Sequence, residues 1–257
     1  MLRKADIYFD NNIQQAKPGD HYIVRINQDP QSLRLTPASL THVCSHYNVV
    51  VLHLNISTND AFQQGTSVSR TAFLYELFLH AAEPYGTDVQ VASASLPKEK
   101  AAKKHVTSVQ TWFEKTKTPA SYLSRSYFTF LPKLFHSFIL TKQHENTVLI
   151  KMFGKTMLHL EHDPTPFSPE VDAWIVKGGL LSHRDNRSKA RLWFMRSDLK
   201  PGLTYAAITH FQPAMPWMLY KLIQAPLHQF VMKQFAEKRY RLSRRFRRDP
   251  RHSSTPN

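Results

Sequence analysis

The side chains of this chain that could carry chemistry are mainly histidines and carboxylates, and several stand close together. His159 and Glu161 alternate along one predicted strand, and His162 and Asp163 follow at its end. Imidazole and carboxylate groups bind metals, but no Cys-x-x-Cys or His-Glu-x-x-His spacing accompanies them. The sequence therefore favours a polar sheet face at this place and predicts no metal site.

Three further polar residues, His183, Arg191 and His210, could act inside an apolar cavity. A buried polar group needs a partner, and a bound ligand can supply it. His210 would serve as a general base if it pointed inward, and His183 could bind an anionic head group. The alternatives are a histidine satisfied by the backbone and an ordinary turn. No catalytic triad, nucleophile elbow or carboxylate pair is recognisable, so we assign no catalytic residue and expect a non-enzymatic role.

The glycines indicate where the backbone bends, and they argue against a nucleotide cofactor. Gly178 and Gly179 stand at the end of a predicted strand, where paired glycines permit a bulge or strong curvature. The turn after Asn55 contains neither Gly-x-Gly-x-x-Gly nor a phosphate-binding Gly-Lys-Ser/Thr. We therefore expect no cofactor.

The charge of the chain is concentrated near its C-terminal end. The formal net charge is +15, and residues 233–251 contain nine basic residues against Glu237 and Asp249. Such a run can attract nucleic acid or an anionic membrane surface, and the alternative is a solvated, frayed helix end. The residues expected to make any such anion contact are Arg244, Arg245, Arg247 and Arg248.

The single cysteine and the absence of long apolar runs bear on the compartment. Cys44 excludes an internal disulfide framework and is typical of a reducing compartment. Without an activating neighbour, its thiol is expected to be a small buried apolar side chain. No apolar run approaches the roughly 18–20 residues of a transmembrane helix, and residues 1–8 do not open a secretory signal. We expect a cytoplasmic protein, with peripheral membrane association as the alternative.

Residues 1–97 are predicted to form a small α/β segment. Strands are indicated at 6–9, 21–26, 49–55 and 88–94, with a helix from Ser69 to Glu83 between the last two. Strand, helix and strand at this spacing indicate a βαβ unit with parallel pairing. Residues 98–104 read as a lysine-rich linker. A second domain at 105–242 and a basic, disordered tail at 243–257 are expected to follow.

The second domain is predicted to alternate strands with two helical regions. A strand at 105–113 precedes a helical stretch from Tyr122 to about Leu140, interrupted near Pro132. A hairpin follows at 147–161, with Gly154-Lys155 as a type II′ turn. The remaining strands are predicted at 171–183, 189–196 and 204–211.

One long helix is expected to close the chain, from about Pro216 to Arg248. Its apolar residues recur at steps of three to five, which predicts one helical stripe formed by Leu219, Ile223, Leu227, Phe230 and Phe235. Pro226 lies inside this region and predicts a kink that would bend the helix over the sheet. A sheet with an apolar face and such a helix can enclose a cavity.

Two stretches of the second domain resemble a known superfamily. Residues 120–135, ASYLSRSYFTFLPKLF, and residues 220–232, YKLIQAPLHQFVM, are similar to the START-like (polyketide-cyclase and lipid-transfer) superfamily. Within it they resemble an uncharacterised branch often attached to short-chain-dehydrogenase-like domains, whose last helix carries a similar Pro-x-His-x-x-aliphatic turn. The resemblance covers residues 105–242. It implies a helix-grip fold with a cavity for an apolar or amphipathic ligand, sometimes with chemistry added.

The sequence and the resemblance together predict an α+β protein. We expect a helix-grip antiparallel sheet wrapped on a long C-terminal helix, preceded by the small α/β segment. The expected function is binding or carriage of an apolar or amphipathic small molecule, and the alternative is a cyclase- or isomerase-like enzyme using a cavity histidine. The residues expected to line the cavity are Trp112, Met152, Trp174, Trp193, Phe194, Phe211, Leu219, Ile223, Leu227 and Phe230. The oligomeric state stays open.

Overall fold

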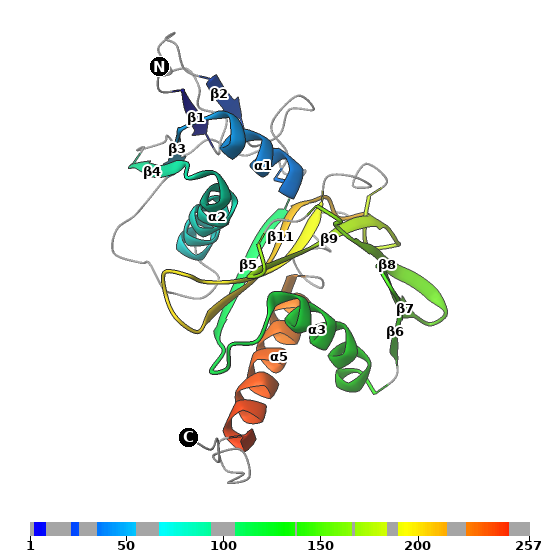
Figure 1. Cartoon of the computed structure of the whole chain (residues 1–257). Coiled ribbons are helices and arrows are strands. Elements are labelled where there is room, and N and C mark those ends of the chain that lie inside the picture. The colour runs from blue at the N-terminus through cyan, green and yellow to red at the C-terminus, as the bar shows by residue number, and fades with distance from the viewer. Residues whose placement is uncertain are drawn as a thin grey trace.

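The computed structural model describes residues 3–8, 22–25, 35–54, 67–93, 106–136, 138–165, 168–183, 190–214 and 225–246. Within these ranges the protein is α+β, with a four-stranded sheet, a seven-stranded sheet and four α-helices. Figure 1 shows the smaller sheet near the N-terminus, the larger sheet in the centre and two helices below it. None of the described helices is both long enough and apolar enough to cross a membrane.

The N-terminal sheet is parallel throughout. Its strands are β1 (Lys4–Tyr8), β2 (Tyr22–Arg25), β3 (Val49–Leu54) and β4 (Asp88–Ser93), in the order β2-β1-β3-β4. Helix α2 (Ser67–Ala82) connects β3 to β4, which confirms the predicted βαβ unit. The predicted linker at 98–104 lies outside the described residues.

Helix α1 (Pro37–His46) was not predicted, although the sequence carries a signal for it. The Thr36 hydroxyl accepts a hydrogen bond from the Ser39 backbone N–H, and Pro37 takes the first helical position. A threonine cap followed by proline is a favoured helix start, because the proline ring presets φ where no N–H partner is needed. Cys44 is buried on this helix, as expected, and burial raises the pKa of its thiol to about 12.

The large sheet has seven strands, and all its neighbouring strands pair antiparallel. The spatial order runs from one edge to the other as β5 (Val106–Phe113), β11 (Leu203–Phe211), β10 (Arg191–Arg196), β9 (Val171–Gly178), β8 (Lys155–His162), β7 (Thr147–Met152) and β6 (Ile139–His144). The predicted hairpins of β7 with β8 and of β9 with β10 are therefore confirmed.

The helical prediction that extended to Leu140 is wrong at its C-terminal end. Helix α3 spans Ala120–Leu134, and residues 139–144 form β6 instead. Pro132 has no N–H, so it cannot bond the Phe128 carbonyl, which accepts the Thr141 hydroxyl of β6 at 2.9 Å. His136 then takes a positive φ of 47°. The helix therefore ends just after its proline and turns directly into a strand.

The turn between β7 and β8 also differs from the prediction. Met152 pairs with Lys155, so the two turn residues are Phe153 and Gly154 rather than Gly154 and Lys155. Their φ values are 49° and 75°. Two positive φ values are the mark of a type I′ turn, whereas the predicted type II′ turn has only one.

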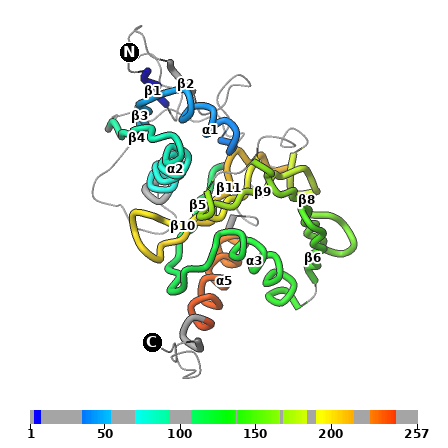
Figure 2. Tube along the Cα trace, viewed as in Figure 1, coloured from blue at the N-terminus to red at the C-terminus, as the bar shows by residue number. Residues whose placement is uncertain are grey.

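The central strands of the large sheet are buried on both faces. Trp193 and Tyr205 belong to one hydrophobic core, which they share with α1, α2 and the parallel sheet. Phe194 and Ala206 belong to a second core on the opposite face, beneath α3 and the C-terminal helix. Figure 2 shows β10 between α2 on one side and α3 on the other. The protein is therefore layered, with the large sheet between two groups of helices.

Helix α2 holds the parallel unit against the large sheet. The Phe73 ring lies 5.9 Å from the Tyr205 ring and 6.5 Å from the Trp193 ring, centroid to centroid. The Tyr205 hydroxyl donates to Glu76 Oε1 at 2.6 Å, and the Asp198 backbone N–H donates to Glu76 Oε2. Burial, followed by the hydrogen bond to Glu76, raises the pKa of Tyr205. The two predicted domains therefore share one core through this helix.

The C-terminal helix α5 spans Ala225–Phe246 and packs against β5 and α3. Its buried face is formed by Val231, Met232, Phe235 and Arg239, while Leu227 and Phe230 are 43% and 48% exposed. The prediction that Leu227 and Phe230 belong to the apolar stripe of this helix is therefore wrong. The buried face runs through Val231, Phe235 and Arg239, at steps of four residues.

The predicted long helix begins at about Pro216, ahead of the described helix α5. Residues 215–224 lie outside the described residues. Pro226 is the second described residue of α5, and the segment just before it, where the predicted kink would bend the helix, is outside the described part of the chain.

Replacing Phe73 by alanine should destabilise the chain strongly, because Phe73 is fully buried between α2 and the large sheet. Deleting a buried phenylalanine typically costs about 3–5 kcal/mol. Phe153→Ala is the matched control, since Phe153 is 75% exposed and surface changes usually stay within about 0.5 kcal/mol. Chemical denaturation of both variants checks this, and equal losses would contradict the shared core.

Candidate functional site

A groove runs between the edge strand β5 and helix α5. It has a volume of about 450 Å³ and is lined by Gln110, Thr111, Trp112, Gln229, Met232, Lys233, Ala236 and Glu237. Trp112 and Met232 are buried, and they form the apolar part of the lining. The glutamines, the lysine and the glutamate give the groove a polar rim. The lining therefore suits a small molecule with both apolar and polar parts.

Two buried polar atoms lie unpaired beside this groove. Trp112 is 5% exposed, and its Nε1 has no hydrogen-bond partner among the described residues. Thr204 lies directly opposite Trp112 in the β5–β11 register, is 0% exposed, and its Oγ1 also lacks a partner there. Burying an unpaired polar group costs free energy, so such atoms are rare in folded proteins.

The same cross-strand row continues to Arg196, which pairs with Thr204 across β10 and β11. Arg196 Nε lies 3.4 Å from Glu170 Oε2, an ion pair outside hydrogen-bond geometry, and its Nη1 donates to the Thr118 carbonyl. Arg239 Nε donates to Glu114 Oε2 at 2.9 Å, and its Nη2 donates to the Thr118 hydroxyl. Two buried or half-buried ion pairs therefore meet at Thr118, and Arg196 of one pair lies directly opposite Thr204.

Aromatic rings fill the space beneath α3. The Phe128 ring lies 4.9 Å from the Trp174 ring, and Tyr127 contacts Phe194 and Phe235 with centroids 5.5 and 5.4 Å apart. Burial raises the pKa of the Tyr127 hydroxyl, which suits a neutral group in this core. Among the described residues, the groove on this face of the sheet lies at its margin, between β5 and α5.

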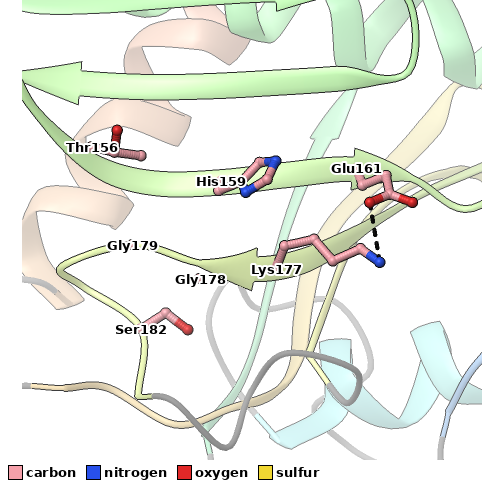
Figure 3. Close-up of a pocket in the computed structure, with 7 residues that line it drawn as sticks. All are labelled: Thr156, His159, Glu161, Lys177, Gly178, Gly179 and Ser182. Carbon is pink, nitrogen blue, oxygen red and sulfur yellow. Dashed lines mark ion pairs between the residues drawn. The ribbon is translucent and has the colours of Figure 1, made fainter.

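A second pocket lies on the opposite face of the sheet, where β8 and β9 separate (Figure 3). Its volume is about 580 Å³, and it is lined by Thr156, His159, Glu161, Lys177, Gly178, Gly179 and Ser182. Lys177 Nζ lies 3.1 Å from Glu161 Oε2 across the two strands. The pocket therefore offers a lysine, a carboxylate and an imidazole at an open, polar surface.

The glycine pair lines this second pocket, and the sequence predicted a bulge or strong curvature at these glycines. The register shifts between His159 and Leu160, opposite the end of β9. Gly179 has a φ of +117°, and a Cβ there would lie 2.2 Å from the Met157 carbonyl oxygen. Only glycine lets the two strands approach so closely.

Arg191 is placed on the face that carries the parallel unit. Its Nε donates to Asp163 Oδ2 at 3.0 Å, and both side chains are buried. Along β10, Leu192 and Phe194 point to one face of the sheet, and Arg191 and Trp193 point to the other. Asp163, which the sequence placed at a polar strand end, is therefore the partner of Arg191.

His210 and His183 lie where β11 ends. His210 has a φ of 52° at a register shift between Ile208 and Phe211, and its Nε2 accepts a hydrogen bond from the Leu35 N–H at 3.3 Å. His183 is exposed, and its backbone N–H donates to Gln212. The imidazole of His210 is thus engaged by the backbone of the parallel unit.

The ten apolar residues predicted to line one cavity are distributed over several places. Trp112 lines the groove. Trp174, Phe194 and Phe211 are buried in the core beneath α3 and α5, and Trp193 lies on the opposite face. Met152 is half-buried on β7, and Leu227 and Phe230 are exposed. Leu219 and Ile223 lie outside the described residues.

The basic residues predicted to contact anions are only partly described. Arg244 and Arg245 belong to the last turns of α5, and Arg247 and Arg248 lie outside the described residues. Arg239 is different from these, because it is buried and paired with Glu114. The basic run therefore contains one structural arginine, Arg239.

Sequence reasoning missed Thr204 and Lys177. Thr204 stands in an apolar strand, and nothing local shows that its hydroxyl would lack a partner. Lys177 shares a face of β9 with Ile175, but its pairing with Glu161 depends on the register of two strands. A hydrophobic strand interrupted by one threonine or one lysine is the only signal that could have pointed to them.

Gly179→Ala should destabilise the bulge that forms the second pocket, because the added Cβ would overlap the Met157 carbonyl. The expected loss is about 1–3 kcal/mol, as for overpacked sites. Gly154→Ala is the matched control, since Gly154 also has a positive φ but nothing within 4 Å of its Cβ position. Thermal unfolding of both variants measures the difference, and an equal cost would mean that close approach is not what requires glycine.

Comparisons with known proteins leave the family of this chain open. No protein-family model and no curated protein matches it. Among solved structures, an uncharacterised protein from Bacillus thuringiensis is similar over 53% of this chain and 98% of its own length, at 10% identity and a TM-score of 0.35. A similarity at this level supports no argument about fold or function.

Proposed function

We propose that this chain binds an amphipathic small molecule in the groove between β5 and α5. The proposal includes a helix-grip arrangement of the large sheet with α3 and α5, as the START-like resemblance implies. The observation that carries it is the pair of unpaired polar atoms, Trp112 Nε1 and Thr204 Oγ1. A ligand would supply the partner that the protein does not.

The expected ligand has an apolar body and a hydrogen-bond acceptor. Its apolar part would lie on Met232, Ala236 and the Trp112 ring, which line the groove. Its acceptor, such as a carbonyl or hydroxyl oxygen, would receive the indole N–H and contact the Thr204 hydroxyl. Lys233 and the glutamines of the rim would face any polar group left in water.

The energetics favour an occupant over an empty site. Leaving a buried donor unsatisfied costs about 1–3 kcal/mol, and two residues that face each other across β5 and β11 each carry such an atom. A bridging water is the simplest alternative occupant, because one water can bond two to four polar groups. The two hypotheses, a bound ligand and a bound water, differ in what they require. Only a bound ligand would also need the apolar lining of the groove.

Binding is favoured over catalysis by the placement of the polar candidates. Arg191 is neutralised by Asp163, and the Nε2 of His210 accepts a backbone N–H of the parallel unit. Both lie on the face of the sheet opposite α5. A cyclase-like reaction in the groove would lack these groups, so we infer a binding or carrier role without an assigned reaction.

Trp112→Phe should lower the amount of ligand that the chain retains, because the ring stays apolar while the donor is lost. The measurement is native mass spectrometry of the purified full-length protein beside organic extraction of the same sample. Wild type should carry a stoichiometric apolar molecule, and the variant should carry much less. Trp193→Phe is the matched control, since that indole lies on the opposite face and donates to Thr209.

The same two variants separate a ligand from a water. After the ligand is stripped, Trp112→Phe should cost about 1–3 kcal/mol less stability than Trp193→Phe, because it removes an unpaired donor rather than a made hydrogen bond. If both variants retain as much ligand as wild type, or if wild type carries none and binds no added fluorescent apolar probe, the groove is not a ligand site.

Removing the basic tail after Phe246 should leave ligand retention unchanged, because the groove and α5 stay complete. Cutting after Lys238 would instead remove Arg239 and break its buried pair with Glu114. Binding of anionic vesicles or RNA by full-length and shortened chains, measured at two salt concentrations, gives the second readout. Loss of the ligand together with the tail would assign binding to the tail.

A further inference from the structure

Three potential metal ligands meet where α2 ends against the large sheet. His80 lies in the last turn of α2, Glu83 opens the 3₁₀ helix η1 (Glu83–Tyr85), and Asp198 lies in the turn between β10 and β11. One ligand atom from each lies within 4.8 Å of the others. None of the three residues lines the groove or the pocket at the glycine bulge.

The hydrogen bonds of His80 determine which ring nitrogen faces the cluster. Its Nε2 lies 3.0 Å from the Arg196 carbonyl oxygen. A carbonyl oxygen only accepts, so Nε2 must carry the hydrogen. Nδ1 lies 3.1 Å from Asp198 Oδ2 and 3.4 Å from Ser168 Oγ. If the imidazole is neutral, Nδ1 therefore carries no hydrogen, and its lone pair is directed at the Asp198 carboxylate.

A lone pair that faces a carboxylate at this distance is unfavourable. A proton on Nδ1, a metal ion beside it or a hydrogen bond from the Ser168 hydroxyl would relieve the repulsion. Glu83 adds a second carboxylate, and Glu76 lies next to Asp198, whose backbone N–H it accepts. The His80 side chain is 1% exposed, so negative charge gathers around one buried imidazole.

We propose that His80, Glu83 and Asp198 bind a divalent transition metal, with Zn²⁺ as the best-fitting representative. Zinc binds imidazole nitrogen and carboxylate oxygen at about 2.0–2.2 Å, so two such ligands lie roughly 3–3.5 Å apart. The 3.1 Å between His80 Nδ1 and Asp198 Oδ2 fits this spacing. An imidazole in the ligand set disfavours Mg²⁺ and Ca²⁺, which prefer oxygen ligands throughout.

The environment of the cluster matches that of other metal-binding histidines. The Nε2–H bond to a backbone carbonyl is the outer contact that fixes the tautomer of a metal-binding histidine. Glu83 is exposed and the Asp198 side chain is 57% exposed, so an ion can reach the site from solvent. Water or the Ser168 hydroxyl would complete the coordination.

A metal at this place would connect two parts of the fold. His80 and Glu83 belong to the parallel unit, and Asp198 belongs to the large sheet. The ion would therefore strengthen the contact that Phe73 and Glu76 already make between them. This role is independent of the groove and of the proposed ligand.

The test is titration of metal-stripped, full-length protein with Zn²⁺ against a competing chelator, with thermal unfolding in parallel. Wild type should bind one equivalent and unfold several degrees higher when it is loaded. Glu83→Gln and Asp198→Asn keep the size of each side chain and lie at the surface, so both should fold. Each should weaken binding by at least about 10- to 100-fold, the range seen even for outer partners.

Two controls identify the site. Glu145→Gln removes an exposed carboxylate in the turn between β6 and β7 and should bind as wild type does. His42 and His46 are exposed and one turn apart on α1, with rings 4.1 Å apart, so this pair could bind zinc by itself. His42→Ala/His46→Ala should keep the full affinity. If that variant loses the ion, if Glu83→Gln and Asp198→Asn bind normally, or if wild type binds no zinc, the proposal fails.

Discussion

Burial of both faces of β10 and β11 is the constraint on which the rest of the structure depends. A strand pair with apolar side chains on both faces must be covered twice, and each cover comes from a different part of the chain. Helix α2 supplies one cover through Phe73, and α3 with α5 supply the other through Phe128 and Phe235. The parallel unit is therefore part of the core of the large sheet.

This arrangement explains where polar groups are found. Each face needs hydrogen-bond partners for the polar side chains that the covers bury. On the α2 face, Tyr205 and the Asp198 backbone both donate to Glu76, and Arg191 pairs with Asp163. On the α5 face, Trp112 and Thr204 lack such partners among the described residues. The difference between the faces is what directs the functional proposal to the groove under α5.

Local sequence signals predicted most elements, and two of the failures share one physical cause. The βαβ unit, two hairpins and the glycine bulge follow from periodicity and from backbone freedom, which neighbouring residues determine. The helix was extended too far beyond Leu134, and the buried face of α5 was assigned to Leu227 and Phe230. In both cases the choice depends on a distant partner, Thr141 of β6 for the first and β5 with α3 for the second.

By itself, the sequence determined the strand alternation, the close approach at Gly179, the absence of a nucleotide-binding glycine pattern and the burial of Cys44. These properties depend on residue type and on neighbours along the chain. Only the tertiary structure decided that Trp193 and Phe194 serve different cores, that Trp112 faces Thr204 without a partner, and that His80 meets Asp198. Each of these depends on the register and packing of segments far apart in sequence, because side-chain partners are set by the fold and not by spacing along the chain.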